Sequence, residues 1–180
     1  VPTLVNAGML EPLNKHMERV GYKYESVGPM TEMSKYHGET YGLITDGNVY
    51  HLQIRKDYFE NPEERKKFED KHGRPMKWPD TWEEYNELVK FFTRPGTIWG
   101  SGDLRARLSG GSWWFYMMFY SKGGFFFADD MNPTIYNEAG VKAAEEWVAT
   151  KSAATPDMAQ WGTPQNIPFI IKGNVFAVNY

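Results

Sequence analysis

Residues 111–127, GSWWFYMMFYSKGGFFF, place an unbroken run of aromatic and methionine residues between glycines. A membrane-spanning helix needs about 20 consecutive apolar residues, whereas the run from Trp113 to Tyr120 contains eight. A lysine follows shortly afterwards, and the mean hydropathy of the chain is -0.60. The run therefore predicts a helix of a water-soluble protein, starting after a turn at 110–112 and ending at the glycine pair 123–124.

With 180 residues, the chain can form one large core, or one domain with part of another. Its net charge is -3 and its charges are interspersed, so no basic stripe indicates a nucleic-acid partner. Cysteine is absent, which excludes disulfides and thiolate chemistry. Aromatic residues make up 16% of the sequence, which exceeds the normal requirement of a core of this size.

The two ends of the sequence resemble cut ends. The first residues, VPTLVNAGM, include neither an initiator methionine nor the apolar block of a signal peptide. The last residues, GNVFAVNY, have the composition of a strand with no turn after it. We therefore expect an interior portion of a longer protein.

Start and stop signals predict two charged or amphipathic helices in the middle of the chain. Asn61 and Pro62 supply an N-cap and a first helical residue, and this helix should end at Gly73. Thr81 opens the next helix with a capping box, and the Pro-Gly pair at 95–96 should end that helix. One face of this second helix is apolar and consists of Trp82, Tyr85, Leu88, Val89 and Phe92.

Two more helices are predicted towards the end. Asn137 caps residues 138–151, in which the apolar stripe is expected to contain Val141, Ala144 and Val148. A short helix opens at Thr163-Pro164, runs through Ile167, Ile170 and Ile171, and should end at Gly173.

Strands are predicted at residues 48–54, 175–178 and 1–5. In the first of these, Tyr50, Leu52 and Ile54 alternate with the residues of the opposite face. Short strands that alternate with helices indicate an α/β fold.

Five phrases follow one another in an order that resembles a known family: AGMLEPLNKHM, YHGETYGLITDGNVYHLQIRKDYFENPEE, PDTWEEYNELVKFF, FYSKGGFFFADDMNPTIYNEAGVKAAEEWV and FIIKGNVFAVNY. The sequence looks like the extracellular solute-binding proteins, family 1, of ABC importers, the maltose-binding-protein-like carbohydrate-binding group. Each phrase alone is weakly specific, whereas five in fixed order are quite specific, and they cover nearly the whole chain.

The resemblance implies an α/β, two-lobed, type II periplasmic-binding-protein-like fold with the ligand between the lobes, represented here mostly by the second lobe. It implies that residues 1–45 end the first lobe, 46–55 form a hinge strand, 56–175 form the second α/β lobe, and 176–180 return towards the hinge. The sequence Ile54-Arg55 departs from the commoner family pattern, in which a tyrosine precedes Asn or Asp.

Sugars combine apolar C–H faces, which stack on aromatic rings, with hydroxyl groups that need hydrogen-bond partners. The turn at Gly111 and Ser112 offers glycine, a hydroxyl and free N–H groups of a helix start, beside two indoles. In the family this turn faces the cleft, so the resemblance favours Trp113 as the stacking surface, while Trp114 points elsewhere. A buried helix face fully accounts for Phe115, Met117, Met118 and Phe119, and packing accounts for the phenylalanines at 125–127.

Further candidate ligand contacts are Asp46, Asn48, Tyr50, Trp161 and Arg105. By resemblance, Asp46 and Asn48 lie at the lobe crossover, Tyr50 follows on the hinge strand, and Trp161 approaches the sugar. Four of the five have a plainer interpretation: a tight Asp-Gly-Asn turn for Asp46 and Asn48, packing for Trp161, and a solvated loop for Arg105, whose guanidinium could otherwise bind hydroxyl groups.

An enzyme is the alternative, because a glycoside hydrolase needs two carboxylates across one bond. The pairs Asp129-Asp130 and Glu145-Glu146 are predicted instead to lie in a loop and on the wet side of a helix. The four histidines share no metal spacing, and no hydrolase or phosphate-loop motif is present.

The resemblance therefore predicts a non-enzymatic substrate-binding component of an ABC importer that takes up a sugar or polyol by hinge closure. It implies no cofactor and no metal, a monomer, membrane subunits of an importer as partners, and a location in the periplasm or outside the cell on a lipid anchor. Which sugar or polyol is bound does not follow from the sequence.

Overall fold

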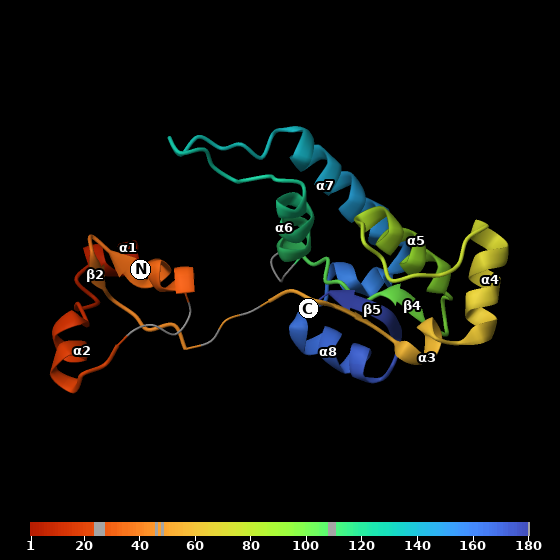
Figure 1. The fold of residues 1–180 in the computed structure, drawn as a ribbon, viewed down its shortest axis with the longest axis horizontal. Helices are drawn as coiled ribbons and strands as arrows, with labels where there is room; N and C mark the ends of the chain where they lie inside the picture. Colours follow the sequence, from red (N-terminus) through yellow and green to blue (C-terminus); the bar gives the residue numbers. More distant parts are fainter. Residues whose placement is uncertain (24–27, 46, 48, 108–110, 180) are drawn as a thin grey trace. The chain divides into compact units, whose positions relative to one another are not determined.

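The computed structural model describes residues 1–23, 28–45, 47, 49–107 and 111–179. The chain divides into two compact units, residues 1–49 and 50–180, and each is described by itself (Figure 1). The division lies within residues 46–55, the segment expected to form the hinge strand. Among the described residues, no helix is both long enough and apolar enough to cross a membrane.

The first unit contains helices α1 (Pro2–Asn6) and α2 (Asn14–Val20), the 3-10 helix η1 (Gly28–Ser34), and the antiparallel pair β1 (Lys35–Tyr36) and β2 (Glu39–Thr40). The prediction of a strand at residues 1–5 is wrong, because this segment is α1. Pro2 has no N–H and a fixed φ, which suits the first turn of a helix, and the N–H groups of Leu4 and Val5 donate to the Val1 carbonyl.

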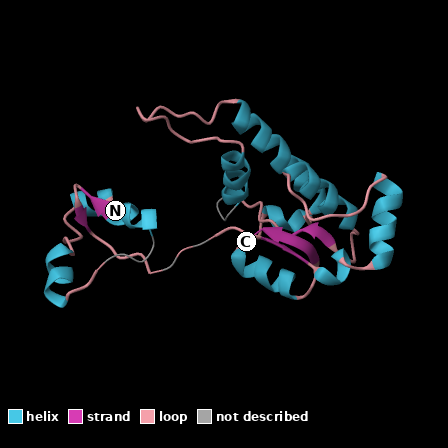
Figure 2. Ribbon diagram, viewed as in Figure 1, coloured by secondary structure: helices cyan, strands magenta, loops and turns pink. Residues whose placement is uncertain are grey.

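The second unit is built on a three-stranded sheet in the order β3-β5-β4 (Figure 2). Its strands are β3 (Leu52–Ile54), β4 (Trp99–Ser101) and β5 (Val175–Asn179). The strand predicted at 48–54 is thus shorter than expected, and that at 175–178 is confirmed. Strand β4 is parallel to β5 and β3 is antiparallel to it, so the carboxyl ends of β4 and β5 lie at one edge of the sheet.

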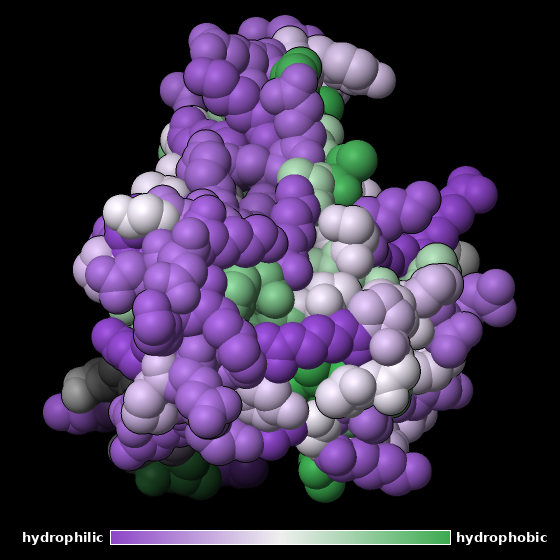
Figure 3. All heavy atoms as spheres, turned by 90° about the vertical axis from the view of Figure 1, so that its right-hand side faces the viewer, coloured by the Kyte–Doolittle hydropathy of each residue, from purple (hydrophilic) through white to green (hydrophobic). Residues whose placement is uncertain are grey.

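Helices α3 (Lys56–Phe59), α4 (Pro62–His72) and α5 (Trp82–Phe92) follow β3. The predicted caps of α4 and α5 are confirmed: the Asn61 side chain accepts from the N–H groups of Glu63 and Glu64, and the Thr81 hydroxyl accepts from Glu84 N–H. Gly73 ends α4 with a φ of 68°, where glycine avoids the steric strain of a side chain. The charged sequence of α4 gives this side of the unit a largely hydrophilic surface (Figure 3).

The apolar face predicted for α5 packs against the sheet. Leu88, Val89 and Phe92 are buried, and the Phe92 ring stacks on Phe176 of β5 with centroids 3.8 Å apart. Helix α8 (Thr163–Ile171) lies on the other side of the sheet (Figure 1) and ends, as predicted, just before Gly173, whose φ is 78°. The sheet is therefore covered on both faces, as in other α/β folds.

Helix α6 (Gly111–Ser121) is the predicted aromatic helix, and it packs against α7 (Glu138–Ala149), which the Asn137 side chain caps. The apolar stripe expected on α7 is wrong, since Val141 and Val148 are 58% and 63% exposed. The buried face contains Gly140 and Ala143, because small residues let α7 approach its neighbours closely. Two 3-10 helices, η2 (Thr150–Ala153) and η3 (Pro156–Ala159), lead on to α8.

Met118 and Phe119 of α6 are fully buried and Phe115 and Met117 are partly buried, as a core face requires. The packing expected for the phenylalanines at 125–127 is confirmed only for Phe126, which is partly buried. The other two are exposed because the segment between α6 and α7 extends away from the core of the unit (Figure 1).

Candidate functional site

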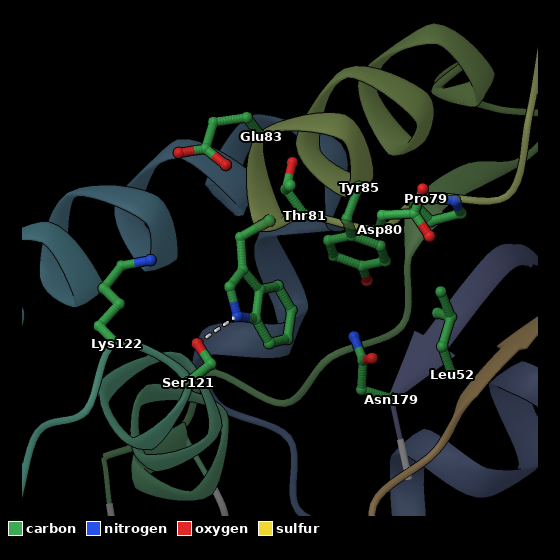
Figure 4. Close-up of a pocket in the computed structure, with 10 residues that line it drawn as sticks. Leu52, Pro79, Asp80, Thr81, Glu83, Tyr85, Ser121, Lys122 and Asn179 are labelled. Atoms are coloured by element: carbon green, nitrogen blue, oxygen red, sulfur yellow. Dashed lines mark hydrogen bonds between the residues drawn. The ribbon is translucent and has the colours of Figure 1, made fainter.

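The carboxyl end of the parallel pair β4 and β5 opens into a pocket with a volume of about 480 Å³ (Figure 4). Ligands of open α/β sheets bind outside the carboxyl ends of the strands, so this edge is where a site is expected on physical grounds. The lining residues come from the strand ends, the start of α5 and the end of α6: Leu52, Pro79, Asp80, Thr81, Trp82, Glu83, Tyr85, Ser121, Lys122 and Asn179.

One wall of the pocket is the half-buried indole of Trp82. Its Nε1 donates to Ser121 Oγ over 2.9 Å, and this hydroxyl in turn donates to the Met118 carbonyl over 2.8 Å. The ring also meets Tyr85 edge to face, with centroids 5.6 Å apart. Trp82 therefore ties the start of α5 to the end of α6 and presents a fixed aromatic surface.

The floor of the pocket is polar and rests on a buried carboxylate. Tyr85 and Asn179 line the pocket, and Figure 4 shows the Tyr85 hydroxyl and the Asn179 side chain pointing towards one another. Beneath them, Asp103 is 1% exposed. The Tyr85 hydroxyl donates to its Oδ2 over 2.8 Å, and the Asn179 backbone N–H donates to its Oδ1 over 3.0 Å.

Burial dominates the electrostatics of this floor. It raises the pKa of the Asp103 carboxyl group, whereas the Asn179 N–H and the Tyr85 hydroxyl act in the opposite direction. Burial and the adjacent Asp103 charge raise the pKa of Tyr85 well above its ordinary value, so the phenol remains a neutral hydrogen-bond donor at physiological pH.

Lys122, which lines the pocket on the α6 side, forms an ion pair with Glu146 of α7. Lys122 Nζ lies 2.6 Å from Glu146 Oε2, and both side chains are largely buried. The prediction that the Glu145-Glu146 pair lies on the wet side of a helix is therefore wrong for Glu146, because packing of α7 on α6 turns it towards Lys122. Burial raises the pKa of Glu146, and Lys122 lowers it.

The turn predicted from the sequence lies at the other end of α6. Trp113 is 51% exposed and Ser112 is exposed, whereas Trp114 is 2% exposed and belongs to the core. Gly111 is buried, and a Cβ atom on it would lie 2.8 Å from the Ala106 carbonyl oxygen. Trp113 is thus the indole of the pair that is accessible to a ligand, and its contact with a sugar remains a prediction.

The remaining sequence-predicted residues are dispersed. Asp46 and Asn48 lie outside the described residues, and Tyr50, at the start of the second unit, is 47% exposed. Trp161 is partly buried beside Trp114 in the core and meets Phe169 edge to face at 5.0 Å. None of the six described site residues predicted from the sequence lines the pocket at the carboxyl end of β5.

Arg105 is not on a solvated loop, and that interpretation is wrong. Its Nη1 donates to the Trp147 carbonyl over 2.9 Å and its Nη2 donates to the Thr150 hydroxyl. The guanidinium also lies over the Trp147 ring, 5.8 Å from the centroid, and burial lowers the pKa of Arg105. These contacts fasten the segment after β4 to the end of α7, a structural role.

Sequence reasoning did not bring together the pocket residues Trp82, Tyr85 and Asn179 with Asp103 beneath them. The first two were expected on an apolar helix face, and the other two were assigned no ligand contact. One sequence pattern could have indicated the polar floor of the pocket: an acidic residue, Asp103, two positions after the end of a short strand.

The described residues form no cluster suited to a metal ion, and the acidic pair 129–130 lies in a loop. Within the described ranges, no three His, Asp or Glu side chains gather so that they could hold a metal ion. Asp129 and Asp130 are exposed in a loop, as predicted, and Asp130 accepts from the Asn132 backbone N–H.

The comparisons with known proteins agree with this architecture. The model of a bacterial extracellular solute-binding protein family matches residues 1–177, and the chain belongs to this family. A search of curated protein sequences gave no significant match. The family model and several of the similar solved structures are described as solute-binding proteins.

Similar solved structures include an ABC transporter solute-binding protein from Thermotoga lettingae TMO bound with alpha-D-tagatose, with 21% identity and a TM-score of 0.70 over 100% of this chain and 45% of that chain. One from Agrobacterium radiobacter K84 in complex with ribitol has 16% identity and a TM-score of 0.74 over 98% and 43%. Maltose-bound T. maritima MalE3 has 19% identity and a TM-score of 0.65 over 96% and 42%.

These likenesses confirm the predicted fold class. The chain has the α/β fold of the type II periplasmic sugar-binding proteins and spans less than half of the length of those solved structures.

Proposed function

We propose that the chain is part of the substrate-binding component of an ABC importer and that its ligand is a sugar or polyol. The family match over residues 1–177 is the observation that carries this proposal. Several solved relatives are described with such ligands, among them alpha-D-tagatose, ribitol and D-mannitol. The activity belongs to the whole protein, of which this chain is a part.

Two surfaces of the second unit have the chemistry that a polyhydroxylated ligand needs. At the start of α6, the exposed Trp113 offers an indole face beside the Ser112 hydroxyl and the tight turn at Gly111. At the carboxyl end of β5, Trp82 offers a second aromatic face above the polar floor of Tyr85 and Asn179. We propose that ligand contacts come from these surfaces.

Four further residues belong to the proposal on the strength of the family resemblance. Asp46 and Asn48 would supply polar contacts at the crossover between lobes, and Tyr50, half-exposed, a ring and a hydroxyl. Trp161 would approach the ligand with the part of its ring that remains accessible.

Binding would act through hinge closure. A ligand that contacts both lobes stabilises the closed state, because only that state makes both sets of contacts. Importer membrane subunits would then recognise the closed form, in the periplasm or at the outer surface of a single-membrane cell. This mechanism breaks no covalent bond.

Thermal denaturation of the full-length protein tests the proposal. Ribitol, D-mannitol, alpha-D-tagatose and maltose form the first panel, each at a concentration well above micromolar. A ligand at 100 times its Kd stabilises the folded state by about 2.7 kcal/mol, so the Tm should rise by several degrees with at least one of them. If no sugar or polyol of a wider panel raises the Tm, the proposed function is wrong.

A further inference from the structure

Asp103 receives hydrogen bonds from two side chains that line the pocket. Its Oδ2 accepts from the Tyr85 hydroxyl over 2.8 Å, and its two oxygens accept from Asn179 Nδ2 over 3.3 and 3.4 Å. The Asn179 backbone N–H donates to Oδ1 as well. All four contacts run in one direction, from the pocket floor into the carboxylate.

This direction decides what the pocket floor can offer a ligand. A carboxamide has donors only on its nitrogen and acceptors only on its oxygen, so with Nδ2 engaged by Asp103, Asn179 keeps its Oδ1 for another partner. The Tyr85 hydroxyl has one hydrogen, which Asp103 takes; its oxygen also lies 3.4 Å from Ser101 Oγ, and it keeps a lone pair for a further donor. Both side chains can therefore act towards a ligand as hydrogen-bond acceptors.

These converging donors call for an acceptor at this position, and an ionised aspartate accepts hydrogen bonds and cannot donate them. The carboxylate is itself held in place, since its own backbone N–H donates to Ser101 Oγ over 3.2 Å. It is buried two residues after the end of β4 and does not line the pocket, so a ligand there would meet Tyr85 and Asn179 rather than Asp103 itself.

We propose that Asp103 is a positioning residue that sets the hydrogen-bond polarity of this pocket, so that Asn179 and Tyr85 accept from ligand hydroxyl groups. The pocket then selects molecules that donate at this point, such as a polyol, over analogues that lack a hydroxyl there. The inference rests on the proposed function and adds to it which chemical group of the ligand is selected and which residues select it.

Asp103→Asn tests this role, because the replacement has the same shape and one arm that donates. In that variant Tyr85 and Asn179 can turn their donors towards the pocket, so the preference should weaken or invert. The full-length protein is titrated with the tightest-binding polyol of the panel and with its monodeoxy analogues. Isothermal titration gives each Kd, and thermal denaturation reports the stability of each variant.

In the wild-type protein, removal of the selected hydroxyl should weaken binding about tenfold, which is the usual effect of one lost hydrogen bond to a well-placed partner. In Asp103→Asn, the ratio of the two Kd values should fall close to one. Thr150→Val is the matched control: it removes a buried hydroxyl outside the pocket and should leave that ratio at its wild-type value even if the Tm falls.

The outcomes separate the two proposals. If the wild-type protein binds no sugar or polyol, the proposed function fails. If it binds and Asp103→Asn shows an unchanged Kd ratio, the positioning role is overturned. If Asp103→Asn does not fold, Tyr85→Phe decides, because it deletes one acceptor and leaves the carboxylate: the Kd ratio should fall, and an unchanged ratio would overturn the inference.

Discussion

Replacement of the adjacent indoles Trp113 and Trp114 by alanine should separate binding from stability. Trp114 is 2% exposed in a core with Leu104 and Met158, and truncation of a buried tryptophan costs about 3–5 kcal/mol. We therefore expect Trp114→Ala to lower the unfolding free energy by about 3–5 kcal/mol and the Tm with it.

Trp113 should behave differently because 51% of the residue is already exposed. Its truncation removes about half as much buried area, and alanine, the better helix former, offsets part of that loss. The expected cost is about 1–2 kcal/mol of unfolding free energy. Loss of a stacking surface for a sugar should weaken binding about tenfold.

Both variants are measured in the full-length protein by thermal denaturation and by titration with the tightest sugar or polyol of the panel. Neighbouring positions of one helix make each variant the control for the other. If Trp113→Ala lowers the Tm as much as Trp114→Ala does and leaves the Kd unchanged, Trp113 is a core residue and the reasoning is refuted.

Two further predictions concern stability. Gly140→Ala should destabilise the fold by about 1–3 kcal/mol, because the new Cβ would lie 2.0 Å from the Ile135 carbonyl oxygen. Alanine normally favours a helix over glycine, so the sign of the effect tests the close approach. Urea denaturation measures it, and a stabilised variant would contradict the prediction. The hydrogen bond from Arg94 has the largest effect on the pKa of the Glu64 carboxyl group and lowers it. Burial has the next largest effect and raises it. A lowered folded-state pKa stabilises the fold above the unfolded-state pKa, about 4.3, and this contribution is lost as the pH falls through the folded-state value. Arg94→Met should therefore reduce the loss of stability on acidification below about pH 4.3, and an acid denaturation curve of unchanged slope would count against it.

The parts of the fold that the sequence predicts well depend on local chemistry. Asn61, Thr81 and Asn137 each accept a backbone N–H of the next turn, and this contact needs nothing from the rest of the chain. The aromatic run forms a helix whose end is likewise set locally: Gly123, just after it, has a φ of 73°.

The parts that the sequence does not predict depend on distant partners. Helix α7 offers two small or apolar faces, and packing on α6 buries Gly140 and Ala143 rather than Val141 and Val148. The polar floor of the pocket joins Asp103 to Asn179, 76 residues later, and this contact exists only because β4 and β5 are neighbours in the sheet. Hydrophobic periodicity carries no information about such a pair.

Helix α6 links the two proposed ligand surfaces, and its length limits what one ligand can reach. Trp113 lies in its first turn, and Ser121, which holds Trp82, is its last residue. Eight residues at 1.5 Å each separate the two by about 12 Å along the helix axis. A single hexose is shorter than that spacing, so we expect it to stack on one indole only, whereas an oligosaccharide could reach both. With a monosaccharide or short polyol as ligand, only one of Trp113→Ala and Trp82→Phe should raise the Kd. With an oligosaccharide both should raise it, and if neither variant changes the Kd for any ligand that binds, neither surface is the site.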